Sequence, residues 1–261
     1  MSEQNVGKLN KLARLLPEDL VADAAWLSAH GYSTSLRAKY LASGWLFQPA
    51  PRVYRRSQEQ LSWQQVVISL QTILLRSPLV VGGRTALEVR GFAHFLKAAE
   101  TEVHLYGSKP PPTWLHTLPL QVRFHYHSDR KLFRNDPVHF GIAGFQWGSR
   151  DRSLTLSTPE RAILELLDEL PDRETFHQAD MLFEGLSSLR PRQLQKLLAD
   201  CTNVKVKRLF FFFADRHRHA WLNHIERAAV DLGSGKRMLV KEGRLDPVYQ
   251  ITVPKELEEV H

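Results

Sequence analysis

The feature that most constrains the fold of this chain is a pair of short helices separated by a turn at Gly31. The first helix is predicted for residues 23–30, with Asp23 as its N-cap. Gly31 then takes the position after the helix where a left-handed backbone conformation costs least. Residues 33–35 offer an N-cap for a second helix that runs to about Gly44. Two helices joined by a tight glycine-containing turn, the second polar and basic at its start, form the helix-turn-helix pattern.

A further helix and a hairpin flank this pair. Apolar residues at helical spacing predict an amphipathic helix over residues 6–16, which Pro17 ends. After the pair, residues 45–47 and 52–55 alternate apolar and polar side chains around the segment 48–51, which predicts a β-hairpin. A basic hairpin that follows a helix-turn-helix is a wing. The N-terminal part is therefore predicted to be a winged helix-turn-helix.

This arrangement indicates which side chains would meet DNA. The second helix of the pair fits a major groove about 12 Å wide, while arginines of the wing meet the flanking phosphates. Hydroxyls and free amides at the start of that helix suit phosphate oxygens. The candidate DNA-binding residues are Ser33, Thr34, Ser35, Arg37, Lys39, Arg52, Arg55 and Arg56. A winged helix can also bind protein instead of DNA, and this alternative stays open.

The net charge of +7 is concentrated in two blocks. Residues 1–57 hold 8 Lys/Arg and 4 Asp/Glu, and residues 186–244 hold 13 and 5, whereas the stretch between them is nearly neutral. Blocks of one sign favour a nucleic-acid partner. The second block offers a candidate nucleic-acid surface at Lys205, Lys207, Arg208, Lys236 and Arg237. An RNA-binding protein or RNA-directed factor that uses this block is the alternative function.

The rest of the chain predicts an α+β fold, in which a larger mixed α/β C-terminal domain follows the winged helix-turn-helix. Two domains are predicted, over residues 1–92 and 93–261. In the first domain the wing ends at about residue 57, and a connecting helix follows over residues 61–76. The C-terminal pattern predicts short strands at 79–81, 103–106, 120–126 and 154–156, helices at 158–169, 192–201 and from about 206, and a terminal hairpin that pairs 237–240 with 249–253.

Catalysis, metal binding and cofactors are not expected. No nucleophile–base pair or paired carboxylates are evident. Gly82-Gly83 is interpreted as a structural turn rather than a phosphate loop, and residues 231–237 are too short for the Walker pattern. His125 and His127 share one strand face, but no carboxylate or cysteine joins them at the spacing of a zinc site, and His139 does not complete one. We therefore expect His125 and His127 to face solvent.

The expected location is the cytoplasm. The lone Cys201 fits a reducing compartment, and no signal peptide or membrane-spanning run is evident.

Several ordered strings in the sequence are distinctive. They include Leu16-Pro17-Glu18 and Ser43-Gly44-Trp45-Leu46 in the N-terminal part, then Gly82-Gly83-Arg84-Thr85-Ala86-Leu87-Glu88-Val89-Arg90-Gly91-Phe92-Ala93-His94, Thr158-Pro159-Glu160-Arg161-Ala162, Asp231-Leu232-Gly233-Ser234-Gly235-Lys236-Arg237 and Tyr249-Gln250-Ile251-Thr252-Val253-Pro254. In this order they resemble the AbiEi family of antitoxins over nearly the whole chain. The wing tip, Pro49-Ala50-Pro51, departs from the family's pattern, in which we expect a glycine-bearing turn. The two prolines make this tip stiffer than a glycine turn.

The resemblance implies a type IV toxin–antitoxin system. Proteins of this family repress their own operon by binding inverted repeats in its promoter. They also counteract a nucleotidyltransferase toxin without forming a stable complex with it. The resemblance assigns DNA binding to the N-terminal domain, and antitoxicity and support of repression to the C-terminal domain. It therefore makes the C-terminal basic residues a candidate antitoxicity surface as well.

Overall fold

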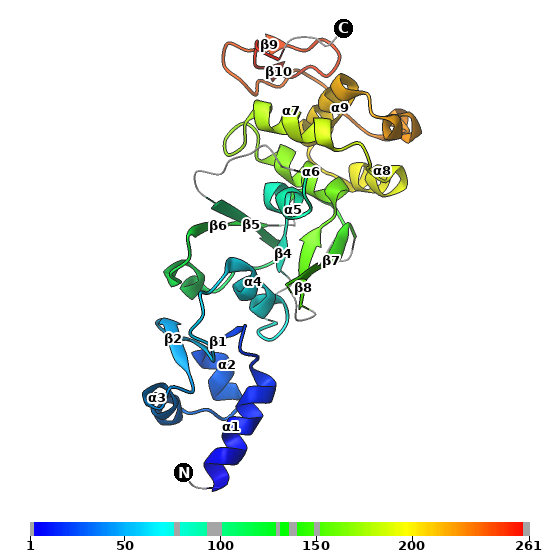
Figure 1. Cartoon of the computed structure of the whole chain (residues 1–261). Coiled ribbons are helices and arrows are strands. Elements are labelled where there is room, and N and C mark those ends of the chain that lie inside the picture. The colour runs from blue at the N-terminus through cyan, green and yellow to red at the C-terminus, as the bar shows by residue number, and fades with distance from the viewer. Residues whose placement is uncertain are drawn as a thin grey trace.

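The computed structural model describes residues 3–75, 79–92, 101–128, 131–135, 140–148 and 152–257. It places the N-terminal helices at one end, a five-stranded sheet in the middle and the C-terminal helices at the other end (Figure 1). The predicted α+β class is confirmed. None of the described helices has the length and apolar content that crossing a lipid bilayer requires.

The N-terminal part alternates helices with a small antiparallel sheet. Its elements are α1 (Glu3–Leu15), β1 (Val21–Asp23), α2 (Ala24–Ala29), α3 (Thr34–Ala42), β2 (Phe47–Ala50) and β3 (Val53–Arg55). The strands pair in the order β1-β3-β2. This order of helices, turn and hairpin agrees with the winged helix-turn-helix prediction. Strand β1 was not predicted; it pairs with β3 and so adds a third strand to the hairpin.

The predicted caps set the ends of α2 and α3. The Asp23 carboxylate accepts a hydrogen bond from the Trp26 amide at 2.8 Å, and the Ser33 hydroxyl accepts one from the Leu36 amide at 3.3 Å. Gly31, between the helices, has a φ of +87°. A left-handed residue at this point lets α3 leave at an angle to α2.

The wing, which is the β2–β3 hairpin, turns later in the chain than the predicted tip at residues 49–51. Pro49 and Ala50 belong to β2, and Ala50 pairs with Val53, so the tip is Pro51-Arg52. Arg52 has a φ of +68°. Proline followed by a residue of positive φ is the sequence of a type II turn, with Arg52 in the place that glycine usually takes. Because β2 is an edge strand, Pro49 interrupts no central ladder.

Helix α4 (Trp63–Gln71) lies between the N-terminal part and the large sheet. It is shorter than the predicted 61–76, and it starts with a capping box in which Ser62 and Gln65 each bond the other's backbone amide. The Gln71 amide group donates to the Leu79 and Thr155 carbonyls at 2.9 and 3.0 Å. These bonds attach the end of α4 to two neighbouring strands of the sheet.

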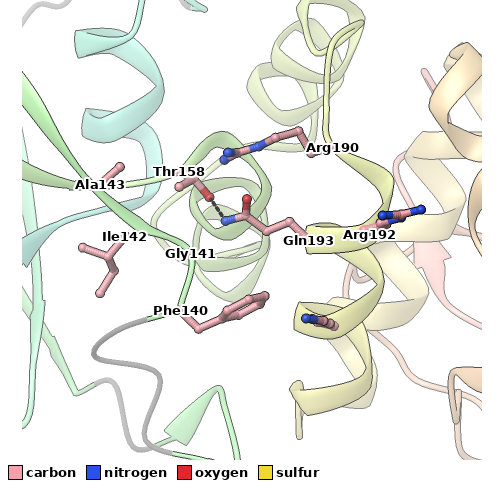
Figure 2. Close-up of a pocket in the computed structure, with 9 residues that line it drawn as sticks. Phe140, Gly141, Ile142, Ala143, Thr158, Arg190, Arg192 and Gln193 are labelled. Carbon is pink, nitrogen blue, oxygen red and sulfur yellow. Dashed lines mark hydrogen bonds between the residues drawn. The ribbon is translucent and has the colours of Figure 1, made fainter.

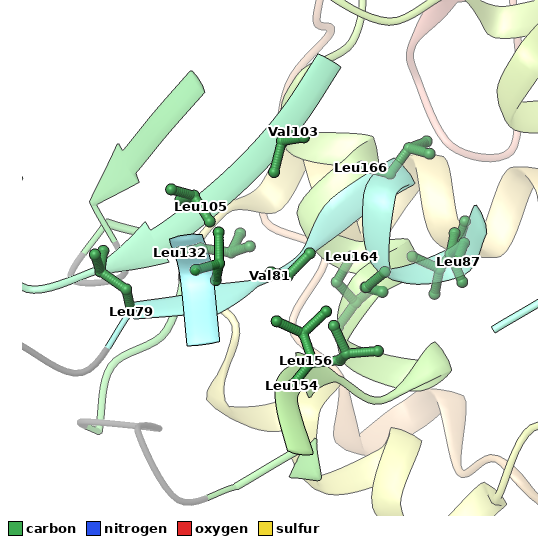
Figure 3. Close-up of a cluster of buried hydrophobic side chains, with 14 of the residues drawn as sticks. Leu79, Val81, Leu87, Val103, Leu105, Leu132, Leu154, Leu156, Leu164 and Leu166 are labelled. Atoms are coloured by element: carbon green, nitrogen blue, oxygen red, sulfur yellow. The ribbon is translucent and has the colours of Figure 1, made fainter. Parts of the chain in front are cut away.

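The five-stranded sheet has the order β6-β5-β4-β8-β7. Its strands are β4 (Leu79–Val81), β5 (Thr101–Gly107), β6 (Val122–Ser128), β7 (Ile142–Trp147) and β8 (Arg152–Ser157). Strand β4 pairs with β5 in antiparallel and with β8 in parallel register. Buried leucines and valines from these strands and from the adjoining helices form the core beside the sheet (Figure 3). Strand β7 was not predicted.

Five helices lie between the sheet and the C-terminal end of the described chain (Figure 1). They are α5 (Gly83–Val89), α6 (Pro159–Asp168), α7 (Phe176–Gly185), α8 (Pro191–Asp200) and α9 (Val204–His217), of which α7 was not predicted. The predicted terminal hairpin is wrong in its pairing. Strand β10 (Thr252–Val253) pairs with β9 (Arg244–Leu245), whereas Arg237 makes only an isolated parallel bridge to Ile251.

Candidate nucleic-acid interface

Five of the predicted DNA-binding residues are exposed. Ser33, Thr34 and Ser35 lie at the start of α3, Lys39 lies farther along this helix, and Arg52 is at the tip of the wing. Figure 1 shows α3 and β2 on the same side of the N-terminal part. Helix α3 begins with amides that its N-cap satisfies only in part, because the Leu36 amide is the one described amide that donates to the Ser33 hydroxyl. Such a helix start attracts phosphate oxygens.

Arg37 is not part of this surface, which corrects the expectation that it contacts DNA. Its side chain is 6% exposed. One terminal nitrogen donates to the Ala24 and Tyr32 carbonyls and to the Ser28 hydroxyl, at 3.1, 2.9 and 2.7 Å. The other donates to Thr34 Oγ1 at 2.9 Å. The guanidinium therefore joins α2, the turn and α3, and fixes the angle between the two helices.

Arg55 and Arg56 also turn inward. Arg55 is 3% exposed, donates to the Glu59 carbonyl at 2.7 Å, and has its pKa lowered by burial. Arg56 donates to the Ala13 and Leu16 carbonyls, both at 3.2 Å, at the end of α1. These contacts correct the expectation that the two arginines face phosphates. They attach the wing to the helices behind it.

Trp45 is an exposed aromatic residue. It is 45% exposed and lies in the chain between α3 and the wing, whereas Tyr54 is buried. An apolar ring beside a basic helix is a frequent contact in nucleic-acid and protein interfaces. We call the exposed set the α3–wing surface; it consists of Ser33, Thr34, Ser35, Lys39, Trp45 and Arg52.

The C-terminal basic block does not form the predicted surface. Lys207 and Arg208 are buried. Arg208 donates to the carbonyls of Leu232 and Gly235 at 2.7 and 2.6 Å, so it holds the glycine-containing loop 231–237 in place. Lys205 donates to two carbonyls at the end of α6. Three of the five predicted cations are thus used inside the fold, while Lys236 and Arg237 are exposed.

A histidine cluster lies on β5 and β6, and it corrects the expectation that His125 and His127 face solvent. His127 is buried; its Nδ1 lies 2.9 Å from a Glu169 oxygen, and its Nε2 lies 2.9 Å from His104 Nδ1. His125 is partly buried, with its Nε2 3.3 Å from Glu102. Parallel pairing in register brings these histidines together. Among the residues that the structure describes, which exclude His139, no metal-binding group of three or more ligands is present.

Burial perturbs two groups in and beside this cluster. Burial, reinforced by the nearby His127, His125 and Arg84, lowers the pKa of His104 to about 3. Burial also raises the pKa of Glu174 to about 7, although Arg84 Nε lies 3.2 Å from its carboxylate and opposes the shift. The His104 imidazole is therefore neutral in the folded protein near neutral pH. No pattern in the sequence marks Glu174, which is distant from the histidines along the chain.

The Gly82-Gly83 turn is structural, as predicted. The Gly83 amide at the start of α5 donates to Glu165 Oε2 at 2.9 Å, and Arg161 donates to the other oxygen of the same carboxylate at 2.7 Å. The space that a phosphate would need holds the Glu165 carboxylate and the Tyr106 ring. Cys201 is likewise buried, and burial raises the pKa of its thiol to about 11, which makes it a poor nucleophile.

Two family models together match nearly the whole chain. Residues 5–98 match the family described as "Transcriptional regulator, AbiEi antitoxin N-terminal domain", and residues 100–254 match "Transcriptional regulator, AbiEi antitoxin, Type IV TA system". A search of curated proteins gives no match. Among solved structures, the RV2827C protein from Mycobacterium tuberculosis is similar, with 13% sequence identity and a TM-score of 0.57 over 96% of this chain and 91% of that one. This likeness concerns the fold alone.

Proposed function

Since the chain belongs to the AbiEi family of transcriptional regulators and antitoxins of type IV toxin–antitoxin systems, we propose that it is a sequence-specific DNA-binding repressor of its own operon. The target is double-stranded DNA that carries inverted repeats in the promoter. The proposed activity is binding, not catalysis; it needs no cofactor and takes place in the cytoplasm. The α3–wing surface is the observation that carries this proposal.

The α3–wing surface has the chemistry that duplex DNA requires. Helix α3 presents hydroxyls and helix amides at its start and Lys39 farther along, so it can lie in the major groove with its first turn near a phosphate. Arg52 extends from the wing tip, where it can reach the next phosphate. The buried Arg37 supports this surface because it fixes α3 against α2. Here phosphate contacts supply affinity, and base edges read by α3 supply specificity.

A salt-titrated mobility-shift assay with the promoter repeat tests the DNA-binding role. Lys39→Ala and Arg52→Ala should each weaken binding and reduce the slope of log affinity against log salt by about one. Lys241→Ala, which removes an exposed cation elsewhere, is the matched control. Unchanged affinity and slope in both test variants would contradict DNA docking through the α3–wing surface. If salt-sensitive DNA binding is absent altogether, the α3–wing surface binds protein instead.

The second part of the proposal is that the chain neutralises a nucleotidyltransferase toxin without holding it in a stable complex. The resemblance and the family description support this part. Cells that express a nucleotidyltransferase toxin encoded beside this gene should stop growing, and co-expression of this chain should restore their growth. Size-exclusion chromatography of a mixture of the two purified proteins should show separate peaks. The Lys39→Ala/Arg52→Ala double variant should still restore growth, because antitoxicity is assigned to the C-terminal half. A co-eluting complex would contradict this mode of neutralisation.

A further inference from the structure

An indole from the C-terminal half reaches the start of the helix-turn-helix. Trp114 lies in the 3₁₀ helix η1 (Thr113–Thr117), which the chain forms between strands β5 and β6. Its Nε1 donates a hydrogen bond to Asp23 Oδ2 at 3.3 Å, although the two residues are 91 positions apart. Asp23 is 4% exposed, so the bond is made inside the protein. Hydrogen bonds to a buried carboxylate are among the stronger polar contacts.

Asp23 is also the N-cap of α2. Its Oδ1 accepts from the Trp26 amide at 2.8 Å, while its Oδ2 accepts from Trp114. The two oxygens of one carboxylate therefore bond to two different parts of the chain. Because both bonds together fix the rotation of the carboxylate, Trp114 fixes the direction from which Asp23 caps the helix.

The next residue, Ala24, joins α2 to the wing and to α3. Its amide donates to the Arg52 carbonyl at 2.8 Å, at the tip of the wing. Its carbonyl accepts from Arg37 Nη1 of α3 at 3.1 Å. The backbone at Asp23 and Ala24 thus sets where α3 and the wing tip lie relative to each other. This spacing decides whether a helix in the groove and a cation at the phosphates can dock on one duplex together.

Trp114 is anchored in packed structure. Its ring packs against the hydrophobic core, and the adjoining Leu115 is buried in that core. Side-chain bonds also join the helices of the C-terminal half to one another. Gln193 of α8 donates to Thr158 Oγ1, at the start of α6, at 3.0 Å (Figure 2). The indole is therefore held by a body that is itself tied together.

We infer that Trp114 is a positioning residue for DNA binding, which through Asp23 holds α2 and the wing tip in the arrangement that the α3–wing surface needs to dock. It acts through Asp23 and not by contact with DNA. The inference rests on the proposed function and deepens it, because it makes the C-terminal half part of the DNA-reading geometry. A surface that is already ordered loses less conformational freedom when it binds, so loss of this bond lowers affinity.

Trp114→Phe in the full chain tests the inference, because it removes the donor and keeps an aromatic ring. In the salt-titrated mobility-shift assay with the promoter repeat, this variant should bind about five- to tenfold more weakly than the wild type. The slope of log affinity against log salt should stay unchanged, because no phosphate contact is lost.

Trp221→Phe is the matched control. It removes a buried indole that donates to the Leu186 carbonyl at 2.7 Å, entirely within the C-terminal half. Its affinity should stay within about twofold of the wild type, since it is independent of the α3–wing surface. A purely structural role of Trp114 would not distinguish the two variants.

Asp23→Ser separates the two bonds of the carboxylate. Serine is also a good N-cap, so its oxygen can still accept from the Trp26 amide, but it provides no second oxygen for Trp114. Asp23→Ser should therefore weaken DNA binding as much as Trp114→Phe does. The double variant should bind no more weakly than either single one, because both substitutions break the same bond.

Three outcomes overturn the inference while the wild type still binds the promoter repeat. They are wild-type affinity of Trp114→Phe, an equal loss of affinity in Trp221→Phe, and strictly additive losses in the double variant. Absence of salt-sensitive binding by the wild type contradicts the proposed repressor function itself, so the two failures are distinct. Urea unfolding shows whether each variant is folded. If Trp114→Phe is not, unchanged affinity of Asp23→Ser overturns the inference instead.

Discussion

Arg152 and Asp19 form a two-pronged ion pair that connects strand β8 to the segment between α1 and β1. The Nε–Oδ2 distance is 3.0 Å and the Nη2–Oδ1 distance is 3.1 Å. A second polar contact joins the same two parts of the chain, because the Trp114 indole donates to Asp23 at 3.3 Å. Polar contacts between residues far apart in the sequence thus hold the N-terminal helices against the large sheet, in a geometry that favours strong pairing.

The Arg152–Asp19 pair should contribute measurably to stability. A double-mutant cycle of Arg152→Ala and Asp19→Ala should give a coupling free energy of about 1 kcal/mol, since the geometry is bidentate but both side chains are partly exposed. Urea unfolding measures it, and 1 M salt should reduce it. Strictly additive effects of the two substitutions would mean that the pair contributes nothing to stability.

Ser69 of helix α4 makes a further contact with the N-terminal part. Its hydroxyl is buried, accepts from the Val21 amide at 2.9 Å and donates to the Gln65 carbonyl at 2.6 Å. Ser69→Ala should cost about 1–3 kcal/mol, because the Val21 amide is left without a partner. Ser57→Ala, at a more exposed turn, should change the free energy of unfolding by less than about 0.5 kcal/mol. Equal effects of the two substitutions would refute this role for Ser69.

Arg37 and Lys39 lie two residues apart on α3 but should behave oppositely. Arg37→Ala should lower the free energy of unfolding by about 2–3 kcal/mol, because it removes the four hydrogen bonds that the buried Arg37 guanidinium donates. Lys39→Ala should leave stability unchanged and affect only DNA binding. Thermal unfolding without DNA separates the two effects. A stable Arg37→Ala variant with weakened DNA binding would place Arg37 at the interface after all.

Gly82 tests the structural nature of the turn before α5. A Cβ on Gly82 would overlap the Glu165 carboxylate and approach Tyr106 Cε2 to 2.8 Å. We expect Gly82→Ala to destabilise the fold by about 3 kcal/mol or more, as overpacking at a buried site does. The control is Gly7→Ala, where the added methyl group meets no atom within 4 Å. Circular dichroism during urea unfolding compares them, and a tolerated Gly82→Ala would rule out this close packing.

Glu174 should make stability depend on pH. Its folded pKa of about 7 lies above the usual 4.5, so the folded state binds a proton that the unfolded state releases. This contribution is fully present below about pH 4.5 and is lost as the pH rises through 7. Between pH 6 and 8.5 the free energy of unfolding of the wild type should fall by about 1 kcal/mol more than that of Glu174→Gln, because the glutamine cannot ionise. Parallel unfolding curves for the two proteins across this range would contradict the raised pKa.

Local signals in the sequence were sufficient where the structure depends on neighbours in the chain. Asp23, Gly31 and Ser33 set the boundaries of α2 and α3 through bonds to residues at most three positions away, and these boundaries were predicted within one or two residues. Strand β1 was missed because three residues carry no periodicity. It forms only because β3 pairs with it, and β3 lies beyond the helix-turn-helix.

The candidate site was less accessible to sequence reasoning, because a charge does not reveal where its partner lies. Arg208 looked like a surface cation, but the carbonyls that accept its hydrogen bonds come from a loop more than twenty residues later. His127 looked exposed because its partner Glu169 follows the next two strands. Burial of a polar side chain is settled by long-range packing, which one sequence does not display.

Strand β4 has a practical consequence for dividing the protein. Although it precedes residue 93, it pairs with β5 on one side and β8 on the other. A fragment that begins at residue 93 would lack its central strand and expose two hydrogen-bonding edges, which promotes aggregation. Separate expression of a C-terminal half should therefore start within residues 57–61, so that α4 and β4 remain with the strands they contact.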